Sequence, residues 1–297
     1  MGSSASGRYA FPALLLANLM LALGPWMVRL ADVGPVAAGF WRLALATPLL
    51  ALIAVRQGLG RPFPGWALIA SVALGGILFA ADLAAWHEGI LRTKLANATL
   101  FGNFASFLFA IYGFLLLRRL PTAAQAVALL LAAAGTVLLL GASFELSREH
   151  FSGDLLSLLA ALFYAFYLVA VDRARRTMLS WHVLAVATAA GVLPLLLMAF
   201  AMGEQIMPAD WTPVVLLSLS SQVIGQGLLV YAMGYLSPVI VGLCFLTQPL
   251  ASAIVGWAVY DERLSAGDGL GALLICAALL LIRPGGTKVA TNAAKAH

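Results

Sequence analysis

The chain has 297 residues, of which 63% are hydrophobic and only 10% carry a charge. Soluble domains devote about a quarter of their residues to charge, and a mean hydropathy of +0.99 leaves too little polar surface for a water-soluble fold. The composition therefore excludes a cytosolic enzyme, a disordered chain and a disulfide-stapled secreted module, and it indicates an integral protein of the lipid bilayer.

The excess of positive charge does not indicate a nucleic-acid partner. The net charge is only +5, and the basic residues are scattered singly or in twos and threes between apolar segments, as in the loops of membrane proteins. Both cysteines, Cys244 and Cys276, lie inside apolar stretches, with no metal-ligand or redox spacing. We therefore expect no metal and no cofactor, and no protein partner is evident.

Ten segments are apolar and long enough to cross a bilayer, which takes about 20 residues per helix. Cutting the chain at charge clusters, glycines and prolines predicts spans over residues 9–29, 35–55, 66–90, 95–117, 122–142, 153–172, 181–202, 212–235, 239–260 and 267–283. The connectors are too short for an extramembrane domain. The ends, 1–8 and 285–297, are expected to be a flexible leader and a flexible tail.

The distribution of lysine and arginine predicts the orientation. An even number of spans places both termini on one side, where eleven basic residues fall; five fall on the other side, and Arg42 lies within the second span. Because cytoplasmic loops carry the excess of basic residues, both termini are expected in the cytoplasm.

The chain repeats itself at about half its length. Residues 86–120 align with 231–264, and Gly89 falls on Gly234. The halves, 9–145 and 150–284, each hold five spans, and because five is odd the second half enters the membrane with opposite polarity. The predicted fold is an all-α polytopic membrane protein with ten transmembrane helices in two inverted five-helix repeats. Many secondary transporters are built this way, with the substrate near the midplane.

Several short motifs resemble the EamA family of the drug/metabolite transporter superfamily. The hinge Asp261-Glu262-Arg263-Leu264-Ser265 precedes a glycine-rich last span, and Leu246-Thr247-Gln248-Pro249-Leu250 matches the proline-bearing ninth span of that family. The resemblance covers residues 9–284. The first half departs from the family pattern, with Arg118 where an acidic residue is usual and Ala105 near the expected proline.

Other details are most similar to the bacterial YddG-type aromatic amino-acid exporters. They are Asn18 with Gly24-Pro25-Trp26, then Trp41-Arg42, and Trp86-His87-Glu88-Gly89. This resemblance implies export of amino acids, with aromatic and other apolar ones favoured, across the bacterial inner membrane. It also implies alternating access through a central cavity between the repeats.

Charged side chains within the spans are candidate site residues, because an ionised group at the bilayer centre costs about 2.5–3.5 kcal/mol. Arg42, beside Trp41, could attract a substrate carboxylate, or it could pair with an internal acid or reach the interface. Asp82 and Trp86 share a helical face and could hold a substrate ammonium through charge and a cation–π contact. Alternatively, Asp82 is the structural partner of Arg42. His87 could carry a coupling proton or be an ordinary interfacial residue.

Amides and aromatic residues complete the predicted site. Amides can line a cavity or join helices, and aromatic residues can hold an apolar side chain or simply pack. The remaining candidates are Asn97, Phe101, Tyr164, Tyr167, Gln222, Gln226, Tyr231 and Gln248, and Pro25 and Pro249 are the candidate hinges.

An intramembrane enzyme or an ATP-driven pump would need a recognisable sequence motif. The sequence has no G-x-S-x-G elbow, no H-E-x-x-H motif and no P-loop, which disfavours an intramembrane enzyme and direct coupling to ATP. A transporter of another small metabolite or drug remains the alternative. Proton-coupled and passive transport are both compatible with these residues.

Overall fold

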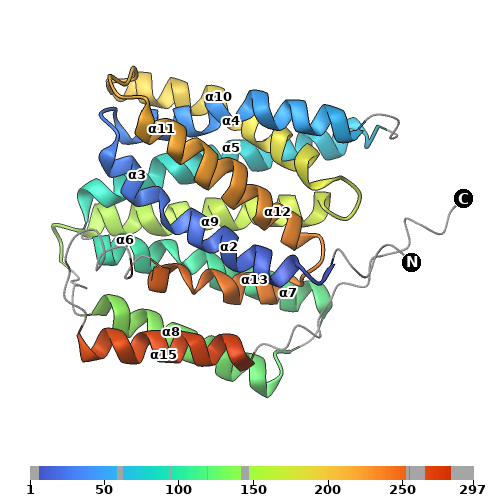
Figure 1. The fold of residues 1–297 in the computed structure, drawn as a ribbon. Helices are drawn as coiled ribbons and strands as arrows, with labels where there is room; N and C mark the ends of the chain where they lie inside the picture. Colours follow the sequence, from blue (N-terminus) through green and yellow to red (C-terminus); the bar gives the residue numbers. More distant parts are fainter. Residues whose placement is uncertain are drawn as a thin grey trace, which may run out of the picture.

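The computed structural model describes residues 7–58, 63–93, 95–118, 120–141, 147–251, 254 and 265–281, without the side chains of 95–97 and 139–141. All its elements are helices (Figure 1). The predicted hinge from Asp261 to Leu264, the tail 285–297 and the first six residues of the predicted leader lie outside this part of the chain.

The described part of the first half contains seven helices. They are α2 (Ala10–Ala22), α3 (Gly24–Leu30), α4 (Pro35–Gly58), α5 (Trp66–Arg92), α6 (Leu95–Gly102), α7 (Phe104–Leu117) and α8 (Ala123–Gly141). The second half contains α9 (Phe151–Ala174), α10 (Ser180–Ala201), α11 (Thr212–Leu217), a π-helix η1 (Ser218–Gln226), α12 (Gly227–Met233), α13 (Pro238–Phe245) and α15 (Ala266–Leu281).

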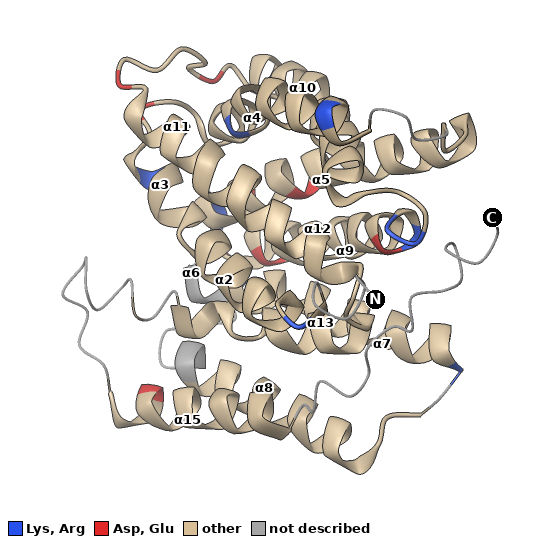
Figure 2. Cartoon of the chain, turned by 45° about the vertical axis from the view of Figure 1, so that its right-hand side comes forward, with Lys and Arg blue, Asp and Glu red and all other residues tan. Residues whose placement is uncertain are grey.

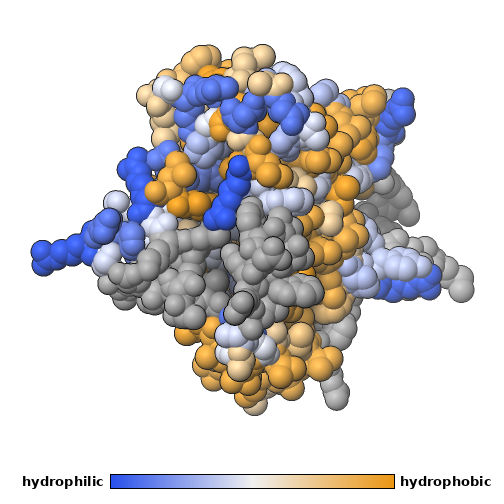
Figure 3. Space-filling view, turned by 60° about the vertical axis from the view of Figure 1, so that its left-hand side comes forward, coloured by the Kyte–Doolittle hydropathy of each residue, from blue (hydrophilic) through white to orange (hydrophobic). Residues whose placement is uncertain are grey.

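These helices follow the predicted apolar segments in order. In the described part of the chain, seven helical segments are long and apolar enough to cross a membrane, and three shorter apolar helices run over Ala123–Leu138, Pro238–Ala251 and Ala266–Leu281. Large apolar side chains such as Leu115, Leu130 and Leu273 are exposed, and apolar residues cover broad stretches of the surface (Figure 3). The all-helical prediction is confirmed, while the number of ten membrane spans stays a prediction.

Two helix breaks lie beside prolines, whereas α4 and α10 continue through Pro48 and Pro194. Pro25 lies in the first turn of α3, directly after the break at Leu23; there its missing N–H costs nothing, whereas inside a helix it would remove a bond. A turn at Leu246 and Thr247 follows α13, and Pro249 lies just beyond it. Both predicted hinges therefore lie beside breaks, which is compatible with bending there.

The main contacts between helices of the two halves come in corresponding pairs. Helix α4 packs on α10, α7 on α13, and α8 on α15, so corresponding segments contact each other. The contact of α5 with α9 is matched by that of η1 and α12 with α2, and the contact of α5 with α10 is matched by that of η1 with α4. Figure 1 shows α8 and α15 as a separate pair at one edge. This reciprocity is what a two-fold relation between the halves produces.

A loop of the second half is tied to the start of α4. The carboxylate of Glu204 accepts hydrogen bonds from the backbone N–H groups of Val36 at 3.1 Å and Ala37 at 2.7 Å, a favourable place for a negative charge because of the helix dipole. Trp41 Nε1 donates to the carbonyl oxygen of Ile206 at 2.6 Å. The same loop leads to Asp210, whose pKa is lowered by a hydrogen bond from the backbone N–H of Thr212.

Candidate functional site

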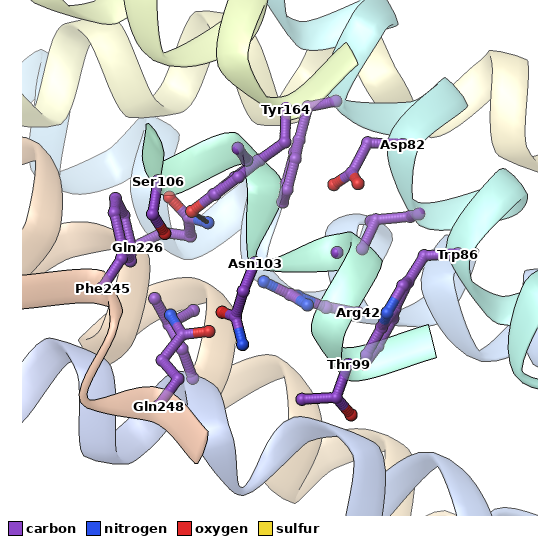
Figure 4. A pocket seen from close by; sticks show the side chains of 15 residues that line it. Arg42, Asp82, Trp86, Thr99, Asn103, Ser106, Tyr164, Gln226, Phe245 and Gln248 are labelled. Carbon is purple, nitrogen blue, oxygen red and sulfur yellow. Dashed lines mark hydrogen bonds between the residues drawn. The ribbon is translucent and has the colours of Figure 1, made fainter. Parts of the chain in front are cut away.

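A cavity of about 130 Å³ with a mixed polar and apolar lining lies between the two halves, with space for several water molecules or a small organic solute. Both halves contribute to its wall. The lining residues are Leu21, Arg42, Phe79, Asp82, Leu83, Trp86, Thr99, Gly102, Asn103, Ala105, Ser106, Tyr164, Gln226, Phe245 and Gln248. Figure 4 shows Arg42, Asp82, Asn103 and Gln248 arranged around a common space. Most described charged residues lie instead in loops and at helix ends (Figure 2).

Arg42 is held in place at the wall of this cavity. Its side chain is only 7% exposed, its Nε donates to Gln222 Oε1 at 3.1 Å, and its guanidinium lies 5.5 Å from the centre of the Phe79 ring. Gln222 in turn donates to Thr188 Oγ1 at 2.8 Å. These contacts orient the guanidinium without neutralising its charge.

Asp82 lines the same cavity without an ion pair to Arg42. Among the described residues, no hydrogen bond and no salt bridge within 4.0 Å joins the two side chains, although each lies in the electrostatic field of the other. The cavity wall therefore contains a guanidinium and a carboxyl group that do not pair with each other. The predicted sharing of one helix face by Asp82 and Trp86 is seen directly, because both line this wall.

The π-helix η1 carries two glutamines, Gln222 in its middle and Gln226 at its end. Gln222 bonds Arg42, as described, while Gln226 lines the cavity, accepts from the Tyr167 hydroxyl at 3.2 Å and donates to the Tyr164 hydroxyl at 3.4 Å. π-helical turns occur often at functional sites. Here the segment connects Arg42 on one side with the two tyrosines on the other.

Several predicted site residues lie behind the wall or away from it. Tyr167 is buried and stacks on Phe79 with 4.7 Å between ring centres, Tyr231 packs against Tyr235 at 5.1 Å, and Trp41 contacts the loop near Ile206. Phe101 lies on α6 outside the lining, and the side chain of Asn97 lies outside the described part.

His87 belongs to a second cavity, which shares Trp86 with the first. This cavity has a volume of about 340 Å³ and is lined by Pro25, Val28, Arg29, Val33, Pro35, Trp86, His87, Ile90 and Leu91. His87 is buried, and its Nδ1 is 2.7 Å from the carbonyl oxygen of Pro35. Since a carbonyl only accepts, Nδ1 carries the proton. Trp86 is thus a common wall of both cavities.

Sequence reasoning missed several lining residues. Thr99, Ser106, Phe79 and Phe245 have types that are frequent in any apolar helix, so nothing in the pattern distinguishes them. Asn103, by contrast, is one of the amides within the predicted spans, a group from which the sequence predicts that some members line a cavity. Among the described residues, no cluster of histidine, cysteine and acidic side chains suited to a metal ion is present.

The match to a protein-family model shows to which family this chain belongs. The model of the EamA-like transporter family matches residues 9–141 and again residues 151–283. The chain belongs to this family. As an EamA protein it has two repeated domains, and it is a multi-pass membrane transporter of the drug/metabolite type with a small-molecule substrate.

Solved structures agree in fold. Of 29 chains that match, one crystal structure superposes with a TM-score of 0.75 at 20% sequence identity, over 94% of this EamA chain and 98% of its own. At this identity the likeness concerns the fold alone. No curated protein matches the sequence significantly.

Proposed function

We propose that this EamA protein is a secondary transporter that exports amino acids, aromatic and other apolar ones favoured, across the bacterial inner membrane. The observation that carries the proposal is the separated pair Arg42 and Asp82 in one cavity. An amino-acid zwitterion has one charge of each sign, so its carboxylate would meet Arg42 and its ammonium Asp82.

The energetics of the membrane support this assignment. Each buried charge costs about 2.5–3.5 kcal/mol at the bilayer centre, and the separation of Arg42 from Asp82 leaves both available to a ligand. Four aromatic residues of the wall, Phe79, Trp86, Tyr164 and Phe245, suit an apolar or aromatic side chain. The resemblance of Trp41-Arg42 and Trp86-His87 to the YddG-type exporters favours the same substrate class.

Alternating access is the mechanism that the architecture favours. The reciprocal packing of the halves fits two inverted repeats, which rock about a central site in many transporters. Trp86 separates the central cavity from the larger cavity beside His87. In this proposal the solute leaves the central cavity past Trp86 when the halves rearrange.

The topology in the proposal is ten spans with both termini in the cytoplasm. In a variant lacking Cys244 and Cys276, Asp210→Cys in the loop before α11 should react with a membrane-impermeant maleimide added to intact cells. Thr122→Cys, before α8, should react only after lysis. Both positions are exposed. The reverse labelling pattern would refute the orientation.

Counterflow in proteoliposomes tests the function. Vesicles loaded with unlabelled phenylalanine or tryptophan should take up the labelled amino acid transiently, and vesicles without protein should not. Running the assay with and without a pH gradient separates proton-coupled from passive exchange. If no amino acid exchanges but another metabolite or a drug does, the substrate class is wrong and the alternative transporter function holds.

A further inference from the structure

We propose that Asn103 binds the carboxylate of the transported solute together with Arg42; this assignment rests on the proposed function. It makes Asn103 a residue that selects solutes bearing a carboxylate, whereas Asp82, across the cavity, selects the ammonium.

The position of Asn103 makes its amide available. It forms the turn between α6, which ends at Gly102, and α7, which begins at Phe104, and it lines the central cavity. Asparagine at a helix N-cap usually bonds the backbone of the next turn, but Asn103 makes no such bond because its own backbone is helical, with φ −66° and ψ −10°. The side chain is therefore not used locally.

The Asn103 amide nitrogen is also without a tertiary partner. The residue is 8% exposed, and within the described part of the chain its buried Nδ2 has no hydrogen-bond acceptor. Nearly all buried polar groups in proteins have a partner, and an unsatisfied one destabilises the fold. A buried donor without an acceptor at the wall of a cavity is explained if the bound ligand supplies the acceptor.

The comparison with Asn18 shows that a buried amide in this protein can be structural. Asn18 is 1% exposed, and its Nδ2 donates to the carbonyl oxygen of Cys244 at 2.6 Å and to Thr247 Oγ1 at 3.3 Å. It joins α2 to the second half and is not part of the cavity lining. Asn103 makes no comparable contact in the described chain, so interhelical bonding does not account for it.

The surroundings of Asn103 favour a carboxylate as the acceptor. Arg42 lines the same cavity, and among the described residues its only hydrogen bond uses Nε, which leaves both terminal nitrogens for a ligand. Ser106 and Gln248 can donate as well, and Figure 4 shows Asn103 and Gln248 directed into the same space.

The test compares ligands that differ only in their charged groups. Phenylalanine, phenethylamine without the carboxylate, and 3-phenylpropionate without the ammonium are titrated into the purified protein, and the shift in melting temperature gives their affinities. Asn103→Ala should weaken phenylalanine and 3-phenylpropionate about tenfold, the loss of one hydrogen bond to a charged group. Asn103→Asp should weaken both further by charge repulsion. Phenethylamine should bind the wild type and Asn103→Ala within about twofold of each other, and it should bind Asn103→Asp at least as tightly, because the added carboxylate attracts its ammonium.

Asn18→Ala is the matched control. It also removes a buried amide and should lower the melting temperature of the unliganded protein, but it should leave the ratio of the phenylalanine and phenethylamine affinities unchanged. This ratio is insensitive to a general loss of stability, so it separates a binding role of Asn103 from a structural one.

The outcomes for the inference and for the proposed function are distinct. If phenylalanine exchanges in vesicles but the affinity ratio is the same in wild type and both Asn103 variants, the function stands and the inference is overturned. If no amino acid exchanges but 3-phenylpropionate stabilises the wild type and not Asn103→Ala, the inference stands and the function is wrong. A wild type that no carboxylate stabilises overturns the inference.

Discussion

Arg42→Met will reduce amino-acid exchange by about 10- to 100-fold in vesicles with matched amounts of protein. The guanidinium is buried at the cavity wall and is oriented by Gln222 and Phe79, so methionine fills similar space but cannot bind a carboxylate. Hydrogen bonds to charged groups contribute about 1.5–3 kcal/mol, and 1.4 kcal/mol corresponds to a factor of ten. The measurement is the initial rate of counterflow at a subsaturating concentration.

The matched control for this effect is Arg56→Met. Arg56 lies on the same helix, α4, but near its end and exposed, so its replacement should change the rate less than twofold. Size-exclusion profiles of both variants must match the wild type, which excludes a loss through misfolding. Exchange by Arg42→Met at the wild-type rate would show that the carboxylate binds elsewhere.

Gly76→Ala will lower the melting temperature by about 5 °C or more, or prevent accumulation of folded protein. Helices α5 and α10 approach so closely that a Cβ atom at Gly76 would lie 2.0 Å from the carbonyl oxygen of Ala187. A backbone atom cannot move aside as a side chain can, so the helices must separate. Overpacking of this kind costs about 1–3 kcal/mol or more, and Gly191 on α10, 3.0 Å from the Gly76 oxygen by the same construction, shares the crossing.

Gly269→Ala is the same chemical change without the crowding. Gly269 lies on α15, where an added Cβ meets no atom within 4 Å. Because alanine favours a helix by about 1 kcal/mol over glycine, this variant should be as stable as the wild type or slightly more so. Thermal unfolding of the two variants in the same detergent gives the comparison. Equal melting temperatures would mean that α5 and α10 do not pack at Gly76.

Much of the architecture could be predicted because it depends on composition and periodicity. Apolar segments must form helices in a bilayer, where every backbone polar group needs an internal partner. Proline removes a donor, and a break lies directly before Pro25, although α4 and α10 continue through Pro48 and Pro194. The repeat predicted which segments correspond, and the reciprocal contacts of α4 with α10, α7 with α13 and α8 with α15 follow that correspondence.

The site could be predicted only in part. The cost of a buried charge identified Arg42 and Asp82, and helical spacing placed Asp82 and Trp86 on one face; all three line the cavity, as do Tyr164, Gln226 and Gln248. The same reasoning also selected Trp41 and His87, which hydrogen-bond backbone oxygens elsewhere. Residue type shows that a polar group needs a partner but not which partner it finds.

Composition, apolar periodicity and the internal repeat thus determined from the sequence that this is a helical membrane protein with two related halves. Only the tertiary structure decided that Gln222 holds Arg42 while Gln226 faces the cavity, and that Asn103 Nδ2 has no acceptor among the described residues. The physical reason is that the direction of a side chain depends on the rotation and register of its helix. In this chain, the π-helix at Ser218–Gln226 and the turn at Asn103 alter the rotation and the register of their helices at the place where the two halves meet.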